Sequence, residues 1–287
     1  MTIEPPAIAQ NPTRILVSVR SAHEAGLITQ AIHHLASEGD QTLAIIDVKE
    51  PNQGALGAPS STCLSEIANV IGRQSSLQTS FAVGELTDWI RDFAGLDADS
   101  IVNLNHEGLC LERLSARFEI DLISRYQFVK LGLANTIGLN WRSLWQNFFS
   151  CLPESTEPVV VSYLDFASCS SPCPEELIEF AAAEPNCETI LFDTFSKEAD
   201  LFGCQPAAAL ESWIFKAKTL GLSTVLAGSI DFSSLARAMA LLPNYIGLRG
   251  AVCSGSRKSE IDRQKVIRLL KQTSLINAIK SELGELH

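Results

Sequence analysis

Three lysines occupy unusual places in this 287-residue sequence, each at or just beyond the end of a short apolar run. The chain has nine lysines, and none precedes Lys49. Lys130 lies inside the apolar run FVKLGL, although lysine is almost never fully buried unless it is paired, and Lys197 follows TILFDTF. An amine that is desolvated and close to other cations has a lowered pKa and can attack a carbonyl group. The lysines therefore favour amine catalysis.

Carboxylates accompany these lysines. Asp47 precedes Lys49 by two residues, Asp193 precedes Lys197 by four, and Asp165 follows another apolar run. A carboxylate within hydrogen-bond reach of an amine can exchange protons with a substrate during condensation and elimination. Structural ion pairs are the alternative interpretation, but three lysines with three aspartates favour a catalytic cluster.

Two glycine-containing segments predict phosphate binding. LAGSI (226–230) and GLRGAVCSGSR (247–257) each follow a late apolar run, where backbone N–H groups of a barrel can hold a phosphate. The candidate phosphate-binding residues are Gly228, Ser229, Arg249, Gly250 and Gly255, with Arg20 and Arg257 as further cations.

Eight apolar or β-branched runs, each followed by a segment with helical spacing, must position these residues. Most are continuous rather than alternating, which is typical of parallel strands covered on both faces. The repeat predicts an α/β fold, a TIM (β/α)8 barrel, whose active site lies at the carboxyl ends of the strands. A doubly wound open sheet is the alternative, but eight repeats favour closure. The predicted strands are 15–19, 42–48, 77–83, 126–133, 159–164, 189–195, 223–229 and 245–250.

The chain is predicted to hold one catalytic domain. Residues 1–13 form a flexible N-terminal tail, and residues 14–287 form the barrel. Segment 84–125 is longer than one connecting helix requires, so we predict an insertion between the third and fourth strands.

Composition excludes several function classes. A net charge of −11 argues against nucleic-acid binding, which uses clustered Lys and Arg, but permits small phosphorylated substrates. No apolar run reaches the roughly 20 residues that span a bilayer, and the N-terminus lacks a signal peptide, so we expect no membrane association and a cytoplasmic location. The cysteines have no C-x-x-C spacing and the histidines are poorly placed, so we expect neither a metal nor a cofactor. Whether the chain forms a homo-oligomer is left open.

Five blocks resemble the (5-formylfuran-3-yl)methyl phosphate synthases, a TIM-barrel family also called 4-(hydroxymethyl)-2-furancarboxaldehyde-phosphate synthases. The blocks follow the order expected for the family, whereas 84–125 departs from its pattern. They are IIDVKEPNQGALGA (45–58), VKLGL (129–133), LFDTFSK (191–197), LAGSI (226–230) and GLRGAVCSGSRKSEID (247–262).

The resemblance implies a carbon–oxygen lyase of methanofuran biosynthesis, a part of C1 metabolism. Such an enzyme condenses two triose phosphates, of the glyceraldehyde 3-phosphate type, into a furan aldehyde phosphate with loss of phosphate and water. The Schiff-base lysine of the family falls on Lys49 and its other active-site lysines on Lys130 and Lys197. Its acidic partners fall on Asp47 and Asp193.

Two rival functions remain open at this stage. A class I (Schiff-base) aldolase acting on another sugar phosphate shares the amine chemistry, but usually needs one Schiff-base lysine and one helper. A non-catalytic barrel that binds a phosphorylated metabolite would keep the phosphate loops without forming an imine. The number of lysines at strand ends favours the two-substrate condensation.

Overall fold

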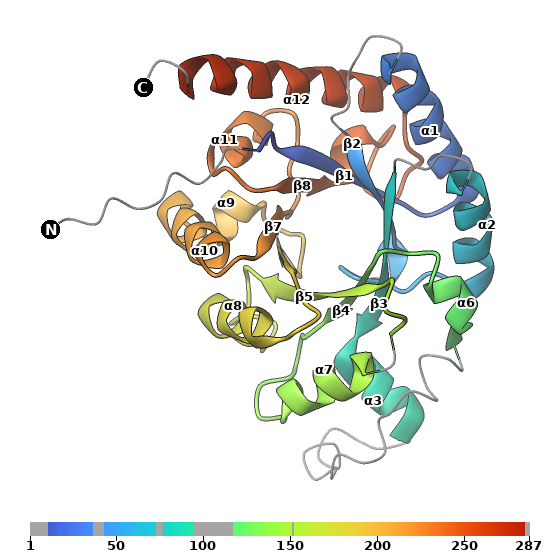
Figure 1. Cartoon of the computed structure of the whole chain (residues 1–287), viewed down its shortest axis with the longest axis vertical. Helices are drawn as coiled ribbons and strands as arrows, with labels where there is room; N and C mark the ends of the chain where they lie inside the picture. The colour runs from blue at the N-terminus through green and yellow to red at the C-terminus, as the bar shows by residue number, and fades with distance from the viewer. Residues whose placement is uncertain (1–10, 37–42, 73–76, 95–116, 151, 285–287) are drawn as a thin grey trace, which may run out of the picture.

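The eight predicted strands form one closed, parallel barrel (Figure 1). In the computed structural model, which describes residues 11–36, 43–72, 77–94, 117–150 and 152–284, the strands follow one another in chain order and β1 pairs with both β2 and β8. The predicted TIM-barrel fold is confirmed. The strands are β1 (Arg14–Val19), β2 (Leu43–Val48), β3 (Gln78–Glu85), β4 (Phe128–Gly132), β5 (Glu157–Tyr163), β6 (Thr189–Asp193), β7 (Ser223–Leu226) and β8 (Tyr245–Leu248).

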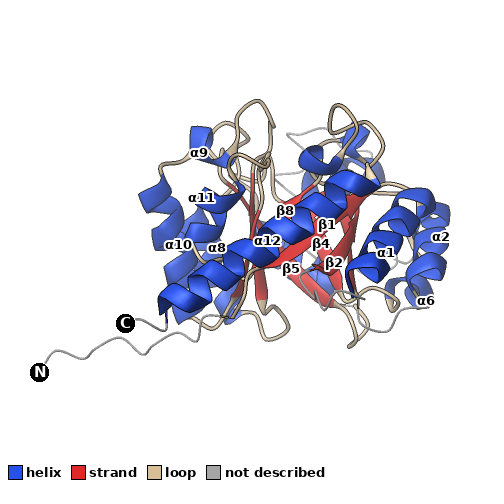
Figure 2. Cartoon of the chain, turned by 90° about the horizontal axis from the view of Figure 1, so that it is seen from above, coloured by secondary structure: helices blue, strands red, loops and turns tan. Residues whose placement is uncertain are grey.

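Helices surround the barrel, and the long C-terminal helix crosses the outside of β8 and β1 and contacts the first helix (Figures 1 and 2). Two short 3-10 turns, Pro51–Gln53 and Gly250–Val252, lie in the loops after β2 and β8. The described helices are α1 (Ala22–Ala36), α2 (Ser61–Ile71), α3 (Leu86–Ala94), α6 (Ile120–Ile123), α7 (Trp141–Phe149), α8 (Pro174–Ala183), α9 (Leu201–Cys204), α10 (Ala207–Thr219), α11 (Leu235–Ala240) and α12 (Arg263–Gly284).

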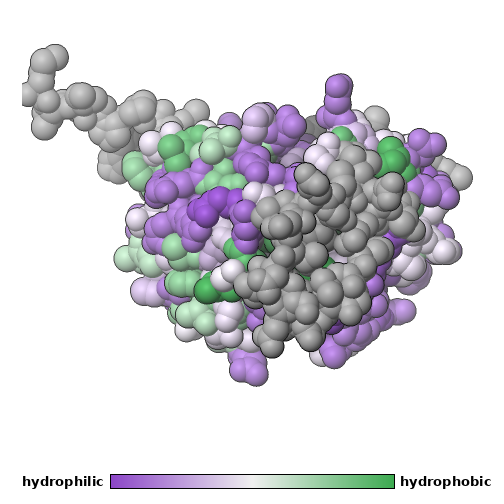
Figure 3. Space-filling model, turned by 90° about the horizontal axis from the view of Figure 1, so that it is seen from below, coloured by the Kyte–Doolittle hydropathy of each residue, from purple (hydrophilic) through white to green (hydrophobic). Residues whose placement is uncertain are grey.

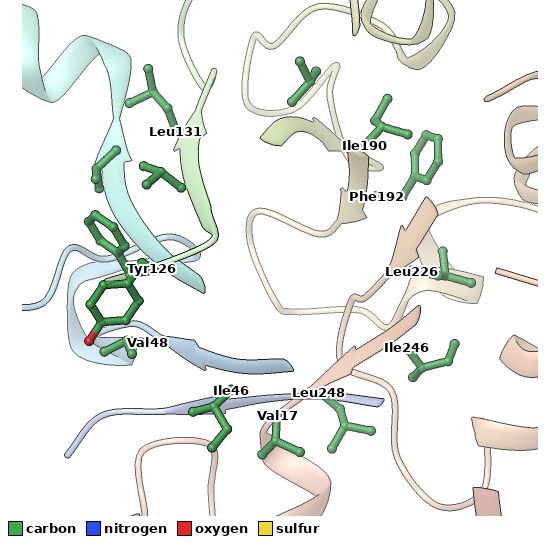
Figure 4. Packing of buried hydrophobic residues seen from close by; sticks show 14 of the residues in the cluster. Val17, Ile46, Val48, Tyr126, Leu131, Ile190, Phe192, Leu226, Ile246 and Leu248 are labelled. Carbon is green, nitrogen blue, oxygen red and sulfur yellow. The ribbon is translucent and has the colours of Figure 1, made fainter. Parts of the chain in front are cut away.

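Alternate residues of each strand face either the helices or the barrel interior. Outward-facing residues such as Ile46, Leu226 and Ile246 pack in the apolar layer between the barrel and the helices (Figure 4). Inward-facing residues, including Ile45 and Leu191, belong to a separate cluster inside the barrel. Both faces are apolar over most of each strand, which explains why the sequence shows continuous apolar runs. Each fully buried Ile or Leu contributes about 1.5–3 kcal/mol.

The inward faces become polar at the carboxyl ends of the strands. On β2, Ile45 is followed two residues later by Asp47, and on β6 Leu191 is followed by Asp193. Both aspartates are 1% exposed, and Lys130 on β4 is 3% exposed. The apolar layers of the barrel interior thus support a buried polar layer at the carboxyl ends of the strands, where the loops to the helices begin.

The predicted insertion falls largely outside the described residues. Within 84–125 the structure describes the end of β3, helix α3 and residues from 117 onward, including α6, whereas residues 95–116 lie outside the description. Residues 1–10 of the predicted tail also lie outside it. On the face seen from below, hydrophilic and apolar side chains are interspersed over the described surface (Figure 3). None of the described helices is both long and apolar enough to cross a membrane.

Candidate active site

A cavity of about 220 Å³ opens at the carboxyl ends of the strands. Its lining includes Lys49, Lys130 and Lys197, together with Asp47 and Asp193, so the five predicted catalytic residues meet in one place. A larger cavity, of about 840 Å³, lies at the amino-terminal ends of β3 to β5, but its lining contains four glutamates and neither lysine nor arginine. An anionic substrate therefore fits the smaller cavity better.

Asp47 is the centre of a buried hydrogen-bond network. Its carboxylate pairs with the Lys130 amine and accepts the hydroxyl protons of Ser18 at 2.9 Å and Ser80 at 2.6 Å. Ser18 and Ser80 stand opposite Asp47 in the registers of β1–β2 and β2–β3, so the strand pairing itself places these donors. Burial alone would raise the pKa of Asp47, but the charges of Lys130 and Lys49 hold it below its usual value.

A second buried pair joins Asp193 to the Lys197 amine. The backbone N–H of Thr194 also donates to the Asp193 carboxylate at 2.8 Å. Burial, together with the cations Lys49 and Arg257, lowers the pKa of Lys197 to about 8 despite the opposing charge of Asp193. An amine with this pKa is partly neutral at physiological pH and can accept a proton.

Lys197 has an unfavourable backbone conformation that its loop must maintain. Its φ of +60° lies in the left-handed region, which a long side chain adopts at a cost of about 1–3 kcal/mol. The Asp165 carboxylate accepts the backbone N–H groups of Phe195 at 2.6 Å and Ser196 at 2.9 Å, immediately before Lys197. Asp165, a candidate from sequence, lies in the loop after β5. Its carboxylate fixes the turn that presents Lys197.

Lys49 differs from the other two lysines. It is half-buried and lines the cavity, and its backbone N–H donates to Val19 at 3.0 Å. Within the described part of the chain, no carboxylate lies within ion-pair distance of its amine, because Asp47 pairs with Lys130 and Asp193 with Lys197.

The loop after β7 presents backbone groups to the cavity. Gly228 has φ +114° and Ser229 has φ +53°, and both residues line the cavity. A Cβ at Gly228 would lie only 3.0 Å from a methyl carbon of Thr194, so this position also requires the absence of a side chain. Gly250, after β8, also lines the cavity, whereas Gly255 does not.

Arg249 lines the cavity, but its guanidinium is fully engaged within the protein. It forms a two-point ion pair with Glu24 of α1, at 2.8 and 2.9 Å, and both side chains are almost completely buried. The remaining N–H groups donate to the carbonyl oxygens of Ser18, Arg257 and Ser259 at 2.7 to 3.0 Å. A phosphate contact by Arg249 would therefore require one of these acceptors to be exchanged.

Arg257 is the cation of the same loop that faces the cavity. It is half-buried, it lines the cavity, and its Nη2 donates to the Gly54 carbonyl oxygen at 3.5 Å. The Arg249 guanidinium binds the carbonyl oxygens of Arg257 itself and of Ser259, so it holds the backbone of the turn that carries Arg257. Sequence reasoning identified Arg257 as an additional cation but missed Glu24, which anchors Arg249, and Ser80.

Comparison with solved structures supports the barrel fold alone. Tryptophan synthase from Mycobacterium tuberculosis superposes with a TM-score of 0.53 at 9% identity, covering 93% of each chain. Phosphoribosyl anthranilate isomerase from Thermus thermophilus gives a TM-score of 0.51 at 14% identity, covering 92% of this chain and all of the other.

Sequence comparison identifies more specific relatives. The (5-formylfuran-3-yl)methyl phosphate synthase of Archaeoglobus fulgidus is 25% identical over 267 residues, covering 90% of this chain and 98% of the relative. The synthase of the same name from Methanosarcina acetivorans is 23% identical over 232 residues, covering 80% and 91%. The family model described as 4-HFC-P synthase matches residues 15–270. This chain therefore belongs to the 4-HFC-P synthase family.

Proposed function

We propose that this enzyme condenses two triose phosphates of the glyceraldehyde 3-phosphate type into (5-formylfuran-3-yl)methyl phosphate, through a lysine Schiff base. Two three-carbon phosphates supply the six carbons, and the atoms balance when one phosphate and two waters are lost. The reaction is a carbon–oxygen lyase reaction, and its product would enter the synthesis of a methanofuran-type cofactor. The names of the relatives support the product, and the site supports the chemistry.

One observation carries the proposal: three amines and two carboxylates surround a single cavity, and their pairing leaves one amine without a partner. The Lys130–Asp47 pair joins β4 to β2, and the Lys197–Asp193 pair joins the loop after β6 to the end of β6. Lys49 lines the same cavity as both pairs. A Schiff base needs an amine that can lose its proton and reach a carbonyl carbon. Lys49 meets the second condition without first breaking an ion pair.

The two lysine–aspartate pairs supply proton transfer. Lys197, with a pKa of about 8, accepts a proton from carbon when neutral and returns it when charged. Lys130 is almost completely buried, and burial lowers the pKa of its amine while Asp47 opposes that effect. Lys130, held in place by its ion pair with Asp47, can therefore act beside the reacting carbonyl as a second proton donor.

The phosphate groups are held on the opposite side of the cavity. The Gly228–Ser229 turn and Gly250 offer backbone N–H groups, and Arg257 offers a guanidinium that can bind a phosphate with two hydrogen bonds. Arg249 supports this loop from behind.

The direct test is incubation of the purified protein with glyceraldehyde 3-phosphate, followed by ultraviolet absorbance and a phosphate assay. We expect a furan aldehyde absorbance to grow in proportion to released phosphate. An aldol adduct formed without phosphate release would instead indicate a class I aldolase. The absence of both products would indicate a barrel that only binds a phosphorylated metabolite.

Borohydride trapping with mass mapping tests the nucleophile. Reduction in the presence of substrate should place the covalent adduct on Lys49, and Lys49→Ala should abolish it. Lys216→Ala, which changes a lysine on the outer helix α10, is the matched control and should trap as the unchanged enzyme does. Lys197→Ala should lose turnover but retain some trapping. Full trapping by Lys49→Ala would refute the assignment.

A further inference from the structure

A third acidic residue, after Asp47 and Asp193, reaches the barrel interior through an irregularity in β3. Ala82 stands opposite Lys130 and Glu85 opposite Gly132, so three steps along β3 match two steps along β4. The extra residue is a β-bulge, and Gly84 within it has φ +94°. Without the bulge, Gly84 would face inward and Glu85 outward. The bulge therefore turns a carboxyl group into the barrel, one layer above Lys130.

Gly132 provides the room that this carboxyl group occupies. A Cβ at Gly132 would lie 2.1 Å from Oε2 of Glu85 and 2.4 Å from Oε1, a distance that no real side chain tolerates. Gly132 follows Lys130 by two residues, so the last two inward positions of β4 hold a lysine and then leave room for a carboxylate. Two separate features, one on each strand, thus act to place the Glu85 carboxyl group.

Glu85 is held by donors from two other segments. The hydroxyl of Tyr163 at the end of β5 donates to Oε1, and the backbone N–H of Ala134 donates to Oε2 at 3.0 Å. Tyr163 stands opposite Asp193 in the β5–β6 register, and its ring meets Phe195 edge-on with centroids 5.3 Å apart. Tyr163 therefore links Glu85 to the loop that carries Lys197.

This pair lies on the side of the site that the 220 Å³ cavity leaves out. Residues of β1, β2, β4, β6 and β8, and of the loops that follow β2, β6, β7 and β8, line that cavity, whereas its lining includes no residue of β3 or β5. Glu85 and Tyr163 are the polar groups that those two strands contribute at their carboxyl ends. The strand registers place both next to that cavity, because Glu85 lies one inward position beyond Lys130 and Tyr163 stands opposite Asp193.

We propose that Glu85, held by Tyr163, is a general acid of this site that serves the dehydration steps, an inference that rests on the proposed function. The Glu85 carboxyl group gives its proton to a hydroxyl of the six-carbon adduct, the C–O bond breaks with its electron pair, and water leaves. Neutral Lys197 takes a proton from the adjacent carbon, and the C–H electron pair forms the C=C bond. The lysine ammonium then returns a proton to the Glu85 carboxylate through water.

The surroundings of Glu85 suit a group that carries a proton near neutral pH. Burial, together with the charges of Asp88 and Asp193, raises the pKa of Glu85 to about 6 against the opposing effect of the Tyr163 and Ala134 hydrogen bonds. Cys169 also faces this pair, and burial raises the pKa of its thiol to about 12, so it stays protonated. Tyr163 has a pKa raised well above its ordinary value by burial and by Glu85, so it remains a donor.

The pH dependence of kcat separates this role from a structural one. When a protonated Glu85 and a neutral Lys197 act together, kcat is level between about 6 and about 8 and falls on both sides. In Glu85→Gln, kcat should instead rise with pH up to about 8 and then level off. In Tyr163→Phe, loss of the donated hydrogen bond raises the pKa of Glu85, so the lower edge of the plateau should move upward.

Glu85→Gln should reduce furan formation about 100-fold or more, the range that a general acid contributes, while the Lys49 imine still traps with borohydride. A six-carbon species that has not lost all its water should accumulate and be visible by mass spectrometry. Two matched controls should keep full turnover: Glu157→Gln, a half-buried glutamate at the other end of the barrel, and Tyr126→Phe, a buried tyrosine bonded to Leu64.

Two outcomes overturn the proposal. Normal furan formation by Glu85→Gln would show that no proton passes through it. Equal loss of trapping and turnover, with the wild-type plateau kept by Tyr163→Phe, would show that Glu85 only supports the fold. An unchanged enzyme that makes neither imine nor furan would overturn the proposed function itself, which is a separate result.

Discussion

Replacing Glu24 by alanine should destabilise this barrel far more than replacing a surface glutamate. Glu24 is 0% exposed and Arg249 is 5% exposed, and the pair joins α1 to the loop after β8. Removal of one partner leaves a buried charge without compensation, which costs about 3–5 kcal/mol. Arg249 also loses the partner that orients its remaining donors toward Ser18, Arg257 and Ser259. The expected loss is therefore about 4 kcal/mol of the free energy of unfolding.

The assay is urea unfolding followed by circular dichroism and tryptophan fluorescence. Glu179→Ala is the matched control, because Glu179 pairs with Lys216 on the surface with side chains 68% and 36% exposed. Exposed pairs of this kind contribute about 0–1 kcal/mol. Glu24→Gln, which keeps the shape of the side chain and one acceptor oxygen, should fall between the two. The ratio between the buried and exposed variants matters more than either absolute value.

Function should change in step with stability. Because Arg249 holds the backbone around Arg257, Glu24→Gln should raise the KM for the triose phosphate more than it lowers kcat. A loss below 1 kcal/mol in Glu24→Ala would refute the reasoning, since it would mean that Arg249 finds another partner at little cost. An unchanged KM in a folded Glu24→Gln would show that the loop does not depend on the ion pair.

Three further predictions follow from the site. Arg257→Met removes a cation that lowers the pKa of Lys197, so the upper edge of the kcat plateau should move above about 8, and the substrate KM should rise about tenfold; an unmoved edge would show that the two groups do not interact. Asp165→Ala should lower kcat at least tenfold by freeing the turn before Lys197, whereas Asp200→Ala, which removes a comparable cap from α9, should not; equal effects would refute a specific role. Folding raises the pKa of Glu85 from 4.5 to about 6, so this group favours the folded state at low pH and this contribution is lost as the pH rises through about 6. Between pH 4.5 and pH 7 the free energy of unfolding of the wild type should therefore fall by about 2 kcal/mol more than that of Glu85→Gln. The same pH dependence in both proteins would contradict this.

The sequence contained enough information for the barrel and for the central amines. Eight apolar runs with helical spacing between them specify a closed parallel sheet, and a charged residue at the end of such a run has only the barrel mouth to occupy. For this reason Lys130 could be placed from its apolar neighbours alone. The ion pairs could not be predicted in this way. Asp47 is close to Lys49 in sequence, but the folded barrel pairs it with Lys130 on another strand.

Other features required the three-dimensional structure for identifiable reasons. The strand predicted over 77–83 ends two residues before the observed end of β3 at Glu85, and a β-bulge reverses the inward and outward alternation there. No single-strand pattern shows such a reversal, although a glycine followed directly by an acid was a signal. Arg249 was a reasonable phosphate ligand from its position, but its contact with Glu24 joins residues 225 positions apart.

The three lysines differ in their pairing, and this difference explains why the site has three. A lysine in an ion pair with a buried carboxylate keeps a defined position and proton, but its amine must leave the pair before it can attack carbon. Lys130 and Lys197 are paired in this way, and their carboxylates are also anchored by Ser18, Ser80 or Thr194. Lys49 lines the same cavity without a salt bridge to Asp47 or Asp193, although its charge acts on both carboxylates. Asp47, two residues before Lys49, does not hold the Lys49 amine in a salt bridge, because it pairs with Lys130 of β4.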